Sequence, residues 1–372
     1  MMFITFANLW SFSVFFLATY LTLVVSVVTY VLPIISSSSK YSTSVSRSSF
    51  SFVNAQDLFW VFATPYIILI AAFLVWTGPS LSAWFGHLVY TSFQAKMGAL
   101  VSASFIMCLA VLTSTTYFSS REIYDYVITT FNFAYWIFIL FMVNSVFTTI
   151  FVIEVLSALI FLLIITSTFS TAYFYRNTNL SFGHLFQHST PFTYLQAVLF
   201  FFWVSLISSL NLFLFCLLFY TKIPTFDWYL VEYIFVYFTN ASTSKEIYTL
   251  CIAWFVLIFC LFLKCGLAPL YVWKPTFFKG VPVYTLFFYI CFFYFFLFLF
   301  VINLLTSYFA EVFYYYSLVV TLFVLIGLFT LLTIVCESYY IKAFLAISSI
   351  LNSLFVILAL STSHVSDLPV WL

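Results

Sequence analysis

The sequence predicts an all-α protein that crosses a membrane about ten times. Of its 372 residues, 65% are hydrophobic and only 6% are charged, whereas soluble domains carry roughly a quarter charged residues. The apolar residues come in runs of about 20, the length that an α-helix needs to span the hydrocarbon of a bilayer. Backbone groups in lipid must be satisfied within their own segment, so we expect helices in spite of the 24% aromatic content.

The polar stretches between the apolar runs are too short to form a soluble domain. The first run has no basic residues before it and is too long for the apolar part of a signal peptide, so it is expected to be the first membrane helix. The ten expected helices cover residues 5–33, 58–77, 94–117, 124–143, 146–172, 192–220, 247–267, 282–306, 311–335 and 341–361.

The few charges are nearly balanced, with a net charge of +1, which offers no electrostatic field for nucleic acid. Most basic residues between the helices fall in the loops after odd-numbered helices, so the positive-inside rule places these loops on the inner side and both termini outside. The inner-side residues are Lys40, Arg47, Arg121, Arg176, Lys274, Lys279 and Lys342, against Lys96, Lys222 and Lys245 on the other side.

Two charges lie in expected helices and away from the first turn of each. Glu154 is the only charged residue between Tyr126 and Tyr175, and Lys264 is the only one from Ile247 to Trp273. A charge within the bilayer is costly and is therefore a functional candidate, here for a proton path. The plainer alternatives are a hydrogen-bonded packing glutamate and a lysine that reaches from a helix end to the interface.

A helix break is expected just after Lys264, because Gly266 and Pro269 follow it and proline removes a backbone donor. A lysine at such a break is well placed to exchange its proton. Redox sites are not expected. The four histidines include no pair on facing helices, and the seven cysteines are scattered without a CxxC pair.

Three motifs resemble the subunit 2 family of NADH:ubiquinone oxidoreductase, respiratory complex I. The longest is the string KCGLAPLYVWKPTFFKGVP that begins at Lys264 and resembles the family's seventh-helix segment. The stretch KAFLAISSI from Lys342 is similar to the start of its tenth helix, and FVIEVLS around Glu154 to its fifth-helix glutamate motif. The resemblance covers about residues 120–362.

The resemblance implies an antiporter-like fold of two inverted five-helix repeats, each with a discontinuous helix. Residues 1–120 would hold helices 1–3, residues 121–306 the complete first repeat, and residues 307–372 the start of a second repeat whose remaining helices are missing. It further implies that Glu154 and Lys264 pair across the bundle core and that Lys342 belongs to the proton path.

The sequence departs from the family at several polar positions. The family's eighth-helix lysine falls at Tyr294, and its sixth-helix lysine aligns with Gln196. Two family histidines are replaced by Tyr271 and Asn352.

The expected function is proton translocation in the membrane arm of complex I, in the mitochondrial inner membrane. The chain would bind no cofactor, since FMN, iron–sulfur clusters and ubiquinone belong to other subunits of the complex. Expected partners are other membrane-arm subunits, lipids such as cardiolipin, and a separate chain that supplies the missing helices. That chain would cover Ser348, Ser349 and Asn352, which would otherwise face lipid. The alternatives are a structural subunit that no longer pumps and a stand-alone cation/proton antiporter.

Overall fold

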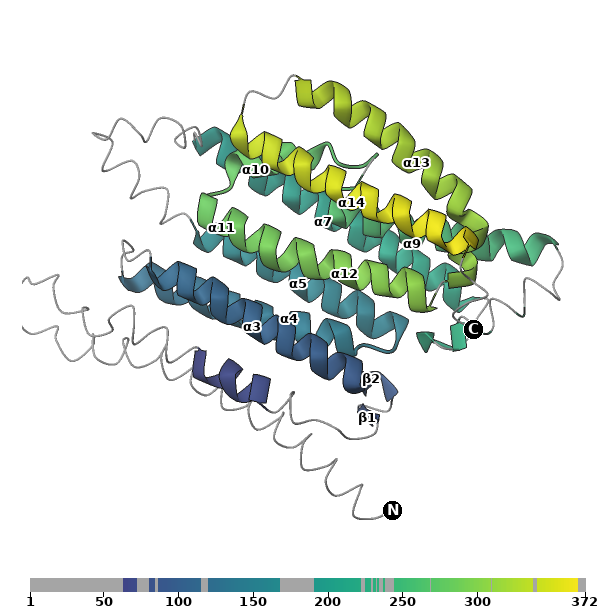
Figure 1. The fold of residues 1–372 in the computed structure, drawn as a ribbon, viewed down its shortest axis with the longest axis horizontal. Coiled ribbons are helices and arrows are strands. Elements are labelled where there is room, and N and C mark those ends of the chain that lie inside the picture. Colours follow the sequence, from purple (N-terminus) through teal and green to yellow (C-terminus); the bar gives the residue numbers. More distant parts are fainter. Residues whose placement is uncertain are drawn as a thin grey trace, which may run out of the picture. The chain divides into compact units, whose positions relative to one another are not determined.

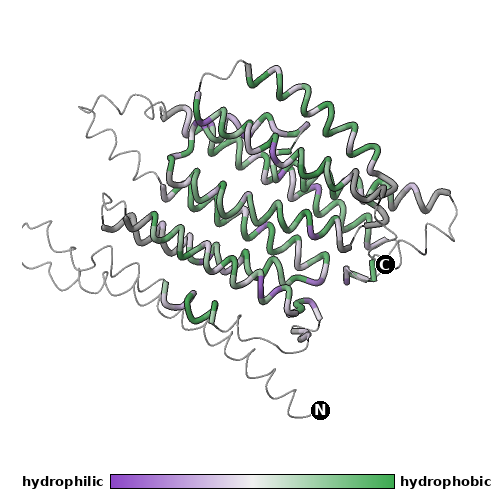
Figure 2. The backbone as a smooth tube through the Cα atoms, in the orientation of Figure 1, coloured by the Kyte–Doolittle hydropathy of each residue, from purple (hydrophilic) through white to green (hydrophobic). Residues whose placement is uncertain are grey.

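The computed structural model shows an almost entirely helical backbone along which hydrophobic residues are interrupted by isolated hydrophilic positions (Figures 1 and 2). In the described part of the chain, six helices are long and apolar enough to cross a membrane. The fold is therefore that of an all-α polytopic membrane protein. The structure describes residues 63–71, 80–83, 86–114, 120–167, 191–221, 225–228, 244–267, 269–308, 310–336 and 340–366, with Leu230, Val231, Tyr233 and Tyr237.

Eight of the ten expected helices coincide with helices of the structure. In two of these eight helices the apolar part is shorter than a membrane span. These parts are Thr129–Met142 and Cys251–Cys265. The expected helix at 5–33 lies outside the described residues, and of the one at 58–77 only residues 63–71 are described, as helix.

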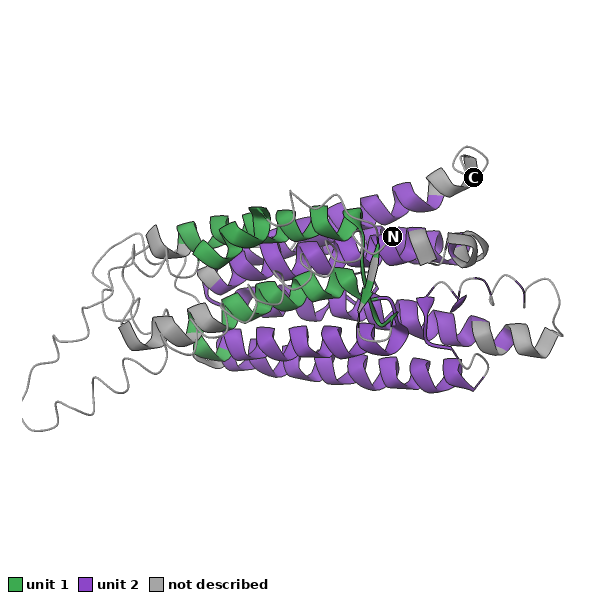
Figure 3. Cartoon of the chain, turned by 90° about the horizontal axis from the view of Figure 1, so that it is seen from below, with its two compact units in different colours: residues 1–143, 165–176 green, residues 144–164, 177–372 purple. Residues whose placement is uncertain are grey.

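The chain divides into two compact units, one of residues 1–143 and 165–176 and the other of residues 144–164 and 177–372 (Figure 3). In the first unit, α3 (Ser92–Ser114) packs against α4 (Ser120–Met142). The buried phenol of Tyr66 donates a hydrogen bond to the carbonyl oxygen of Phe131 at 2.8 Å, and its ring lies 4.4 Å from that of Phe105. Aromatic packing thus holds this unit's core together.

A short β-hairpin, which was not among the expected elements, precedes α3. Its strands β1 (Leu81–Ala83) and β2 (Leu88–Tyr90) are antiparallel, and Leu81 pairs with Tyr90. Gly86 lies in the turn with φ of 92°, a left-handed conformation that glycine adopts without steric cost.

The second unit contains the remaining helices, and α7 packs closely against both α9 and α10. Towards the C-terminal end, α14 packs against α13 and also against α10. These helices are α5 (Val146–Thr166), α7 (Pro191–Tyr220), α9 (Ser244–Cys265), α10 (Trp273–Gly280), α11 (Val283–Phe288), α12 (Phe295–Asn303), α13 (Ala310–Cys336) and α14 (Ile341–Ser366).

The helix expected at 282–306 is a continuous helical run that is widened twice. Two π-helical segments, η3 (Tyr289–Tyr294) and η4 (Leu304–Tyr308), flank α12. Such π segments are rare and occur frequently at functional sites, because the extra residue redirects the side chains that follow it.

The start of α5 is fixed by a segment from far along the chain. The backbone N–H of Val146 donates to the carbonyl of Phe226 at 2.8 Å. The indole Nε1–H of the buried Trp228 donates to Thr149 Oγ1 at 3.0 Å. The first bond satisfies a backbone donor at the helix start that has no partner within the helix, and the second ties the Trp228 side chain to the first turn of α5.

Candidate functional site

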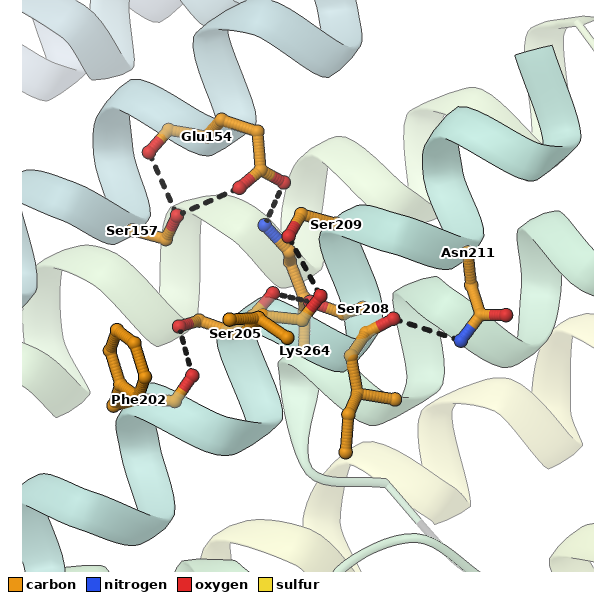
Figure 4. A network of polar contacts seen from close by, with 10 residues as sticks. Glu154, Ser157, Phe202, Ser205, Ser208, Ser209, Asn211 and Lys264 are labelled. Carbon is orange, nitrogen blue, oxygen red and sulfur yellow. Dashed lines mark hydrogen bonds and ion pairs between the residues drawn. The ribbon is translucent and has the colours of Figure 1, made fainter. Parts of the chain in front are cut away.

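The candidate site is an ion pair between α5 and α9. Lys264 Nζ lies 2.6 Å from Glu154 Oε1, although the two residues are 110 positions apart in the sequence. Figure 4 shows the lysine reaching the carboxylate from the neighbouring helix. The lysine side chain is 5% exposed and that of the glutamate 29%. The structure thus brings into direct contact the two charges that the sequence analysis paired.

The surroundings of Glu154 supply one further hydroxyl. Ser157, one turn later on α5, donates to the backbone carbonyl of Glu154 at 2.8 Å and lies 3.5 Å from its Oε2 atom. An ionised carboxylate has several acceptor positions, and the ammonium and this hydroxyl approach different oxygens. The short contact of the carboxylate is therefore the one with Lys264, and the serine hydroxyl lies at the limit of hydrogen-bond distance from the other oxygen.

The end of α9 is a Schellman motif that places Lys264 in the last turn. Gly266 has φ of 62°, its N–H donates to Leu263 O at 3.2 Å, and the N–H of Leu267 donates to Phe262 O at 2.9 Å. This pattern ends a helix at a left-handed glycine. The C-terminal end of a helix also favours a cation, so the break stabilises the ammonium of Lys264.

The chain stays non-helical for a few residues after this motif and then starts α10. The exposed Pro269 lies in a turn closed by a hydrogen bond from the Leu270 N–H to Leu267 O at 2.8 Å. The indole N–H of Trp273 reaches back to Leu263 O at 3.1 Å. The helix break expected at Gly266 and Pro269 is therefore present, and the Trp273 indole adds a second donor to the Leu263 carbonyl at the end of α9.

Helix α7 carries several polar residues within its apolar sequence. Figure 4 shows Ser205, Ser208, Ser209 and Asn211 on the α7 side of the ion pair. Ser208 is fully buried, and each serine hydroxyl donates to the carbonyl three residues earlier.

The other predicted site residues lie apart from the ion pair. Lys342, at the start of α14, donates to Val281 O at 2.9 Å and so ties α14 to the end of α10. Gln196 is exposed on α7. Tyr294 is buried in η3, and its hydroxyl bonds to Ser353 Oγ on α14 at 2.7 Å.

Sequence reasoning misplaced Lys274. It was assigned to an inner-side loop, whereas the structure places it in α10 with 0% of its surface exposed. Its Nζ donates to Cys265 O at 3.3 Å and lies 3.3 Å from the centre of the Tyr294 ring. α10 packs against α7 and α14, so a residue that looks like a loop lysine is enclosed by long-range contacts. Its place in the seventh-helix motif, next to Trp273, was the signal that could have revealed it.

Within the described residues, no three His, Cys, Asp or Glu side chains come close enough to hold a metal ion. His184 and His188 lie outside that part of the chain. What the site offers chemically is a buried lysine at a helix break, paired with a partly exposed carboxylate from α5.

No protein-family model and no curated protein matches the chain. Its fold is similar to that of a chain in the structure described as respiratory complex I from Thermus thermophilus with bound aureothin, with a TM-score of 0.61 and 16% sequence identity. The likeness covers 93% of this chain and 64% of that one, so this chain spans less than two thirds of the length of the chain it matches. The two chains share a fold.

Proposed function

We propose that this chain is a membrane subunit of respiratory complex I and takes part in proton translocation coupled to NADH oxidation and ubiquinone reduction. The observation that carries the proposal is the 2.6 Å contact between Glu154 and Lys264 at the end of a broken helix. The fold likeness to a chain of the Thermus complex supports the proposal that this chain belongs to such a complex. Broken helices whose ends face charged groups are typical of ion-transporting membrane proteins.

The geometry supports a simple cycle for the lysine. While Glu154 is in contact, its carboxylate balances the charge of the nearly dry Lys264 ammonium. If a conformational change draws the carboxylate away, the ammonium stays in an apolar site without a counter-ion, which costs free energy until the lysine releases its proton. Return of the carboxylate restores the first state once the lysine has been reprotonated from the other side.

The test uses the intact assembly. The tagged chain is purified from its membranes in mild detergent, and its co-purification with NADH-oxidising activity is measured. Lys264→Ala and Lys264→Arg are then compared in sealed vesicles, where proton uptake is followed during NADH oxidation. We expect normal assembly and loss of the proton flux that this subunit carries, because alanine has no proton to exchange and a guanidinium does not release its own. Lys96→Ala, at an exposed position of α3, is the matched control.

Two other functions are outcomes of the same test. A structural subunit that no longer pumps is favoured by Tyr294, which stands where the related family has a lysine. It would give wild-type pumping in both Lys264 variants. A stand-alone cation/proton antiporter would purify without NADH-oxidising partners and would exchange cations for protons in vesicles that contain this chain alone.

The proposal assigns electron transfer to other subunits. FMN, the iron–sulfur clusters and ubiquinone would be bound outside this chain, and the assembly would lie in the mitochondrial inner membrane among lipids such as cardiolipin. Fractionation of membranes, followed by lipid analysis of the purified assembly, tests the location and the lipid.

The exposed face of α14 supports a further helical partner. Asn352 is exposed in the middle of the apolar span Ile341–Ser361, whereas Ser348 and Ser349 are half-buried. All three residues were expected to face outward, and only Asn352 does so. An unpaired polar group in lipid costs on the order of 1 kcal/mol, and a neighbouring helix removes that cost. We propose that the partner is a second multi-helix chain. Cross-linking from an Asn352→Cys variant in intact membranes, followed by mass spectrometry, would identify it.

A further inference from the structure

Lys274 is a second buried cation, and the site around it is built for a lysine. The residue is fully buried, with its ammonium against Cys265 O and the Tyr294 ring, and among the described residues no carboxylate lies within ion-pair distance of it. A buried charge without a carboxylate is expensive, and a methionine would fill the same space without that cost. Packing alone therefore does not explain this lysine.

The helix break leaves room for the Lys274 side chain. A Cβ atom on Gly266 would lie only 2.9 Å from Lys274 Cδ, so a glycine is needed there for steric as well as conformational reasons. The Nζ atom then reaches the carbonyl of Cys265, the residue next to Lys264. The break thus has a lysine on each side, one paired with Glu154 and the other directed back towards the same helix end.

Hydroxyl groups continue from Lys274 towards α14. The ammonium lies against the face of the Tyr294 ring, a favourable cation–π contact. The phenol donates to Ser353 Oγ at 2.7 Å, and Ser353 in turn donates to Ile350 O at 2.7 Å. Tyr294 thus holds the cation with its ring and connects it to α14 through its hydroxyl.

Two more hydroxyls lie on the same helical run. Thr285 Oγ1 and Tyr289 OH are buried and have no hydrogen-bond partner among the described residues. Buried hydroxyls are nearly always hydrogen-bonded, to ordered water where no protein group is in reach. The run from α11 through η3 therefore presents polar groups suited to hydrating a proton path.

We infer that Lys274 is the second proton-carrying lysine of this subunit and that protons pass between it and Lys264 across the helix break. In the transfer, an N–H bond of one ammonium breaks and the proton binds the neutral amine of the other, directly or through water, so the total charge is unchanged. The lysine expected on the eighth helix by family resemblance is replaced by Tyr294, and the ammonium of Lys274 occupies the space against that side chain. This inference rests on the proposed function.

The experiment measures proton uptake per NADH oxidised in vesicles that contain the whole assembly. Lys274→Met, which keeps the side-chain length, and Lys274→Arg, which keeps the charge, should both assemble and lose the proton flux of this subunit. Tyr294→Phe keeps the ring and should pump better than Tyr294→Leu, which removes it. The decisive variant returns the lysine to the helix, because Lys274→Thr combined with Tyr294→Lys should recover flux that Lys274→Thr alone has lost.

The results for the Lys264 and Lys274 variants distinguish failure of the proposed function from failure of this inference. If Lys264→Ala pumps normally, the proposed function itself is wrong. If Lys264→Ala loses flux while Lys274→Met or Lys274→Arg pumps like wild type, the inference alone is overturned, since Lys274 then carries no proton. Failure of both Lys274→Met and Lys274→Arg to assemble would also overturn it, because the lysine would then serve the structure.

Discussion

Substitution of Gly266 by alanine should destabilise the second unit through two separable effects. The φ of 62° is left-handed, and a residue with a Cβ pays about 1–2 kcal/mol to adopt it. The added Cβ would also lie 2.9 Å from Lys274 Cδ and 3.2 Å from Trp273 Cζ2. Forcing buried neighbours to shift costs about 1–3 kcal/mol. We therefore expect a total loss of about 2–5 kcal/mol in the free energy of unfolding.

The two effects can be measured apart. Gly86→Ala is the control for the backbone effect, because its φ is also left-handed at 92° and a Cβ there meets nothing within 4 Å. The steric effect is measured by a cycle in which Gly266→Ala is combined with Lys274→Ala, since the second change removes the Cδ atom. Unfolding in mixed micelles is followed by tryptophan fluorescence, to which the neighbouring Trp273 contributes.

Two results would refute this reasoning. One is a loss of less than about 1 kcal/mol for Gly266→Ala, below the backbone effect alone. The other is additivity of Gly266→Ala and Lys274→Ala within about 0.5 kcal/mol, because residues in contact are expected to show coupling.

Two further predictions concern helix contacts. Gly280→Ala should separate α10 from α7 and reduce the amount of folded protein, because the new Cβ would clash with the backbone oxygen of Thr193 and with Ala197 Cβ. Adding Ala197→Gly should not restore the amount of folded protein, since the backbone oxygen of Thr193 stays. Thr149→Val should lower the free energy of unfolding by about 1–3 kcal/mol, because the buried Trp228 indole N–H loses its acceptor. Thr149→Ser keeps a hydroxyl and should retain most of the stability. Equal losses for the valine and serine variants would contradict this explanation.

The sequence by itself determined the local features of the second unit. Membrane helices can be located from composition, because a segment in lipid must be apolar and must satisfy its own backbone. The helix break could be located for a similar reason, since Gly266 and Pro269 act on the backbone around them. Glu154 and Lys264 could be chosen as site residues because each is the lone charge of its apolar segment.

The tertiary structure decided which of these groups meet. Glu154 and Lys264 are 110 residues apart in the sequence, and the pattern of residues within either helix does not specify which partner its charged residue contacts. For Lys274, the sequence led to a wrong expectation of exposure. Its position between two expected helices is typical of a solvated loop, yet the structure buries it completely in α10, against Cys265 and Tyr294. Burial depends on the segments that pack against a residue, and those segments come from elsewhere in the chain.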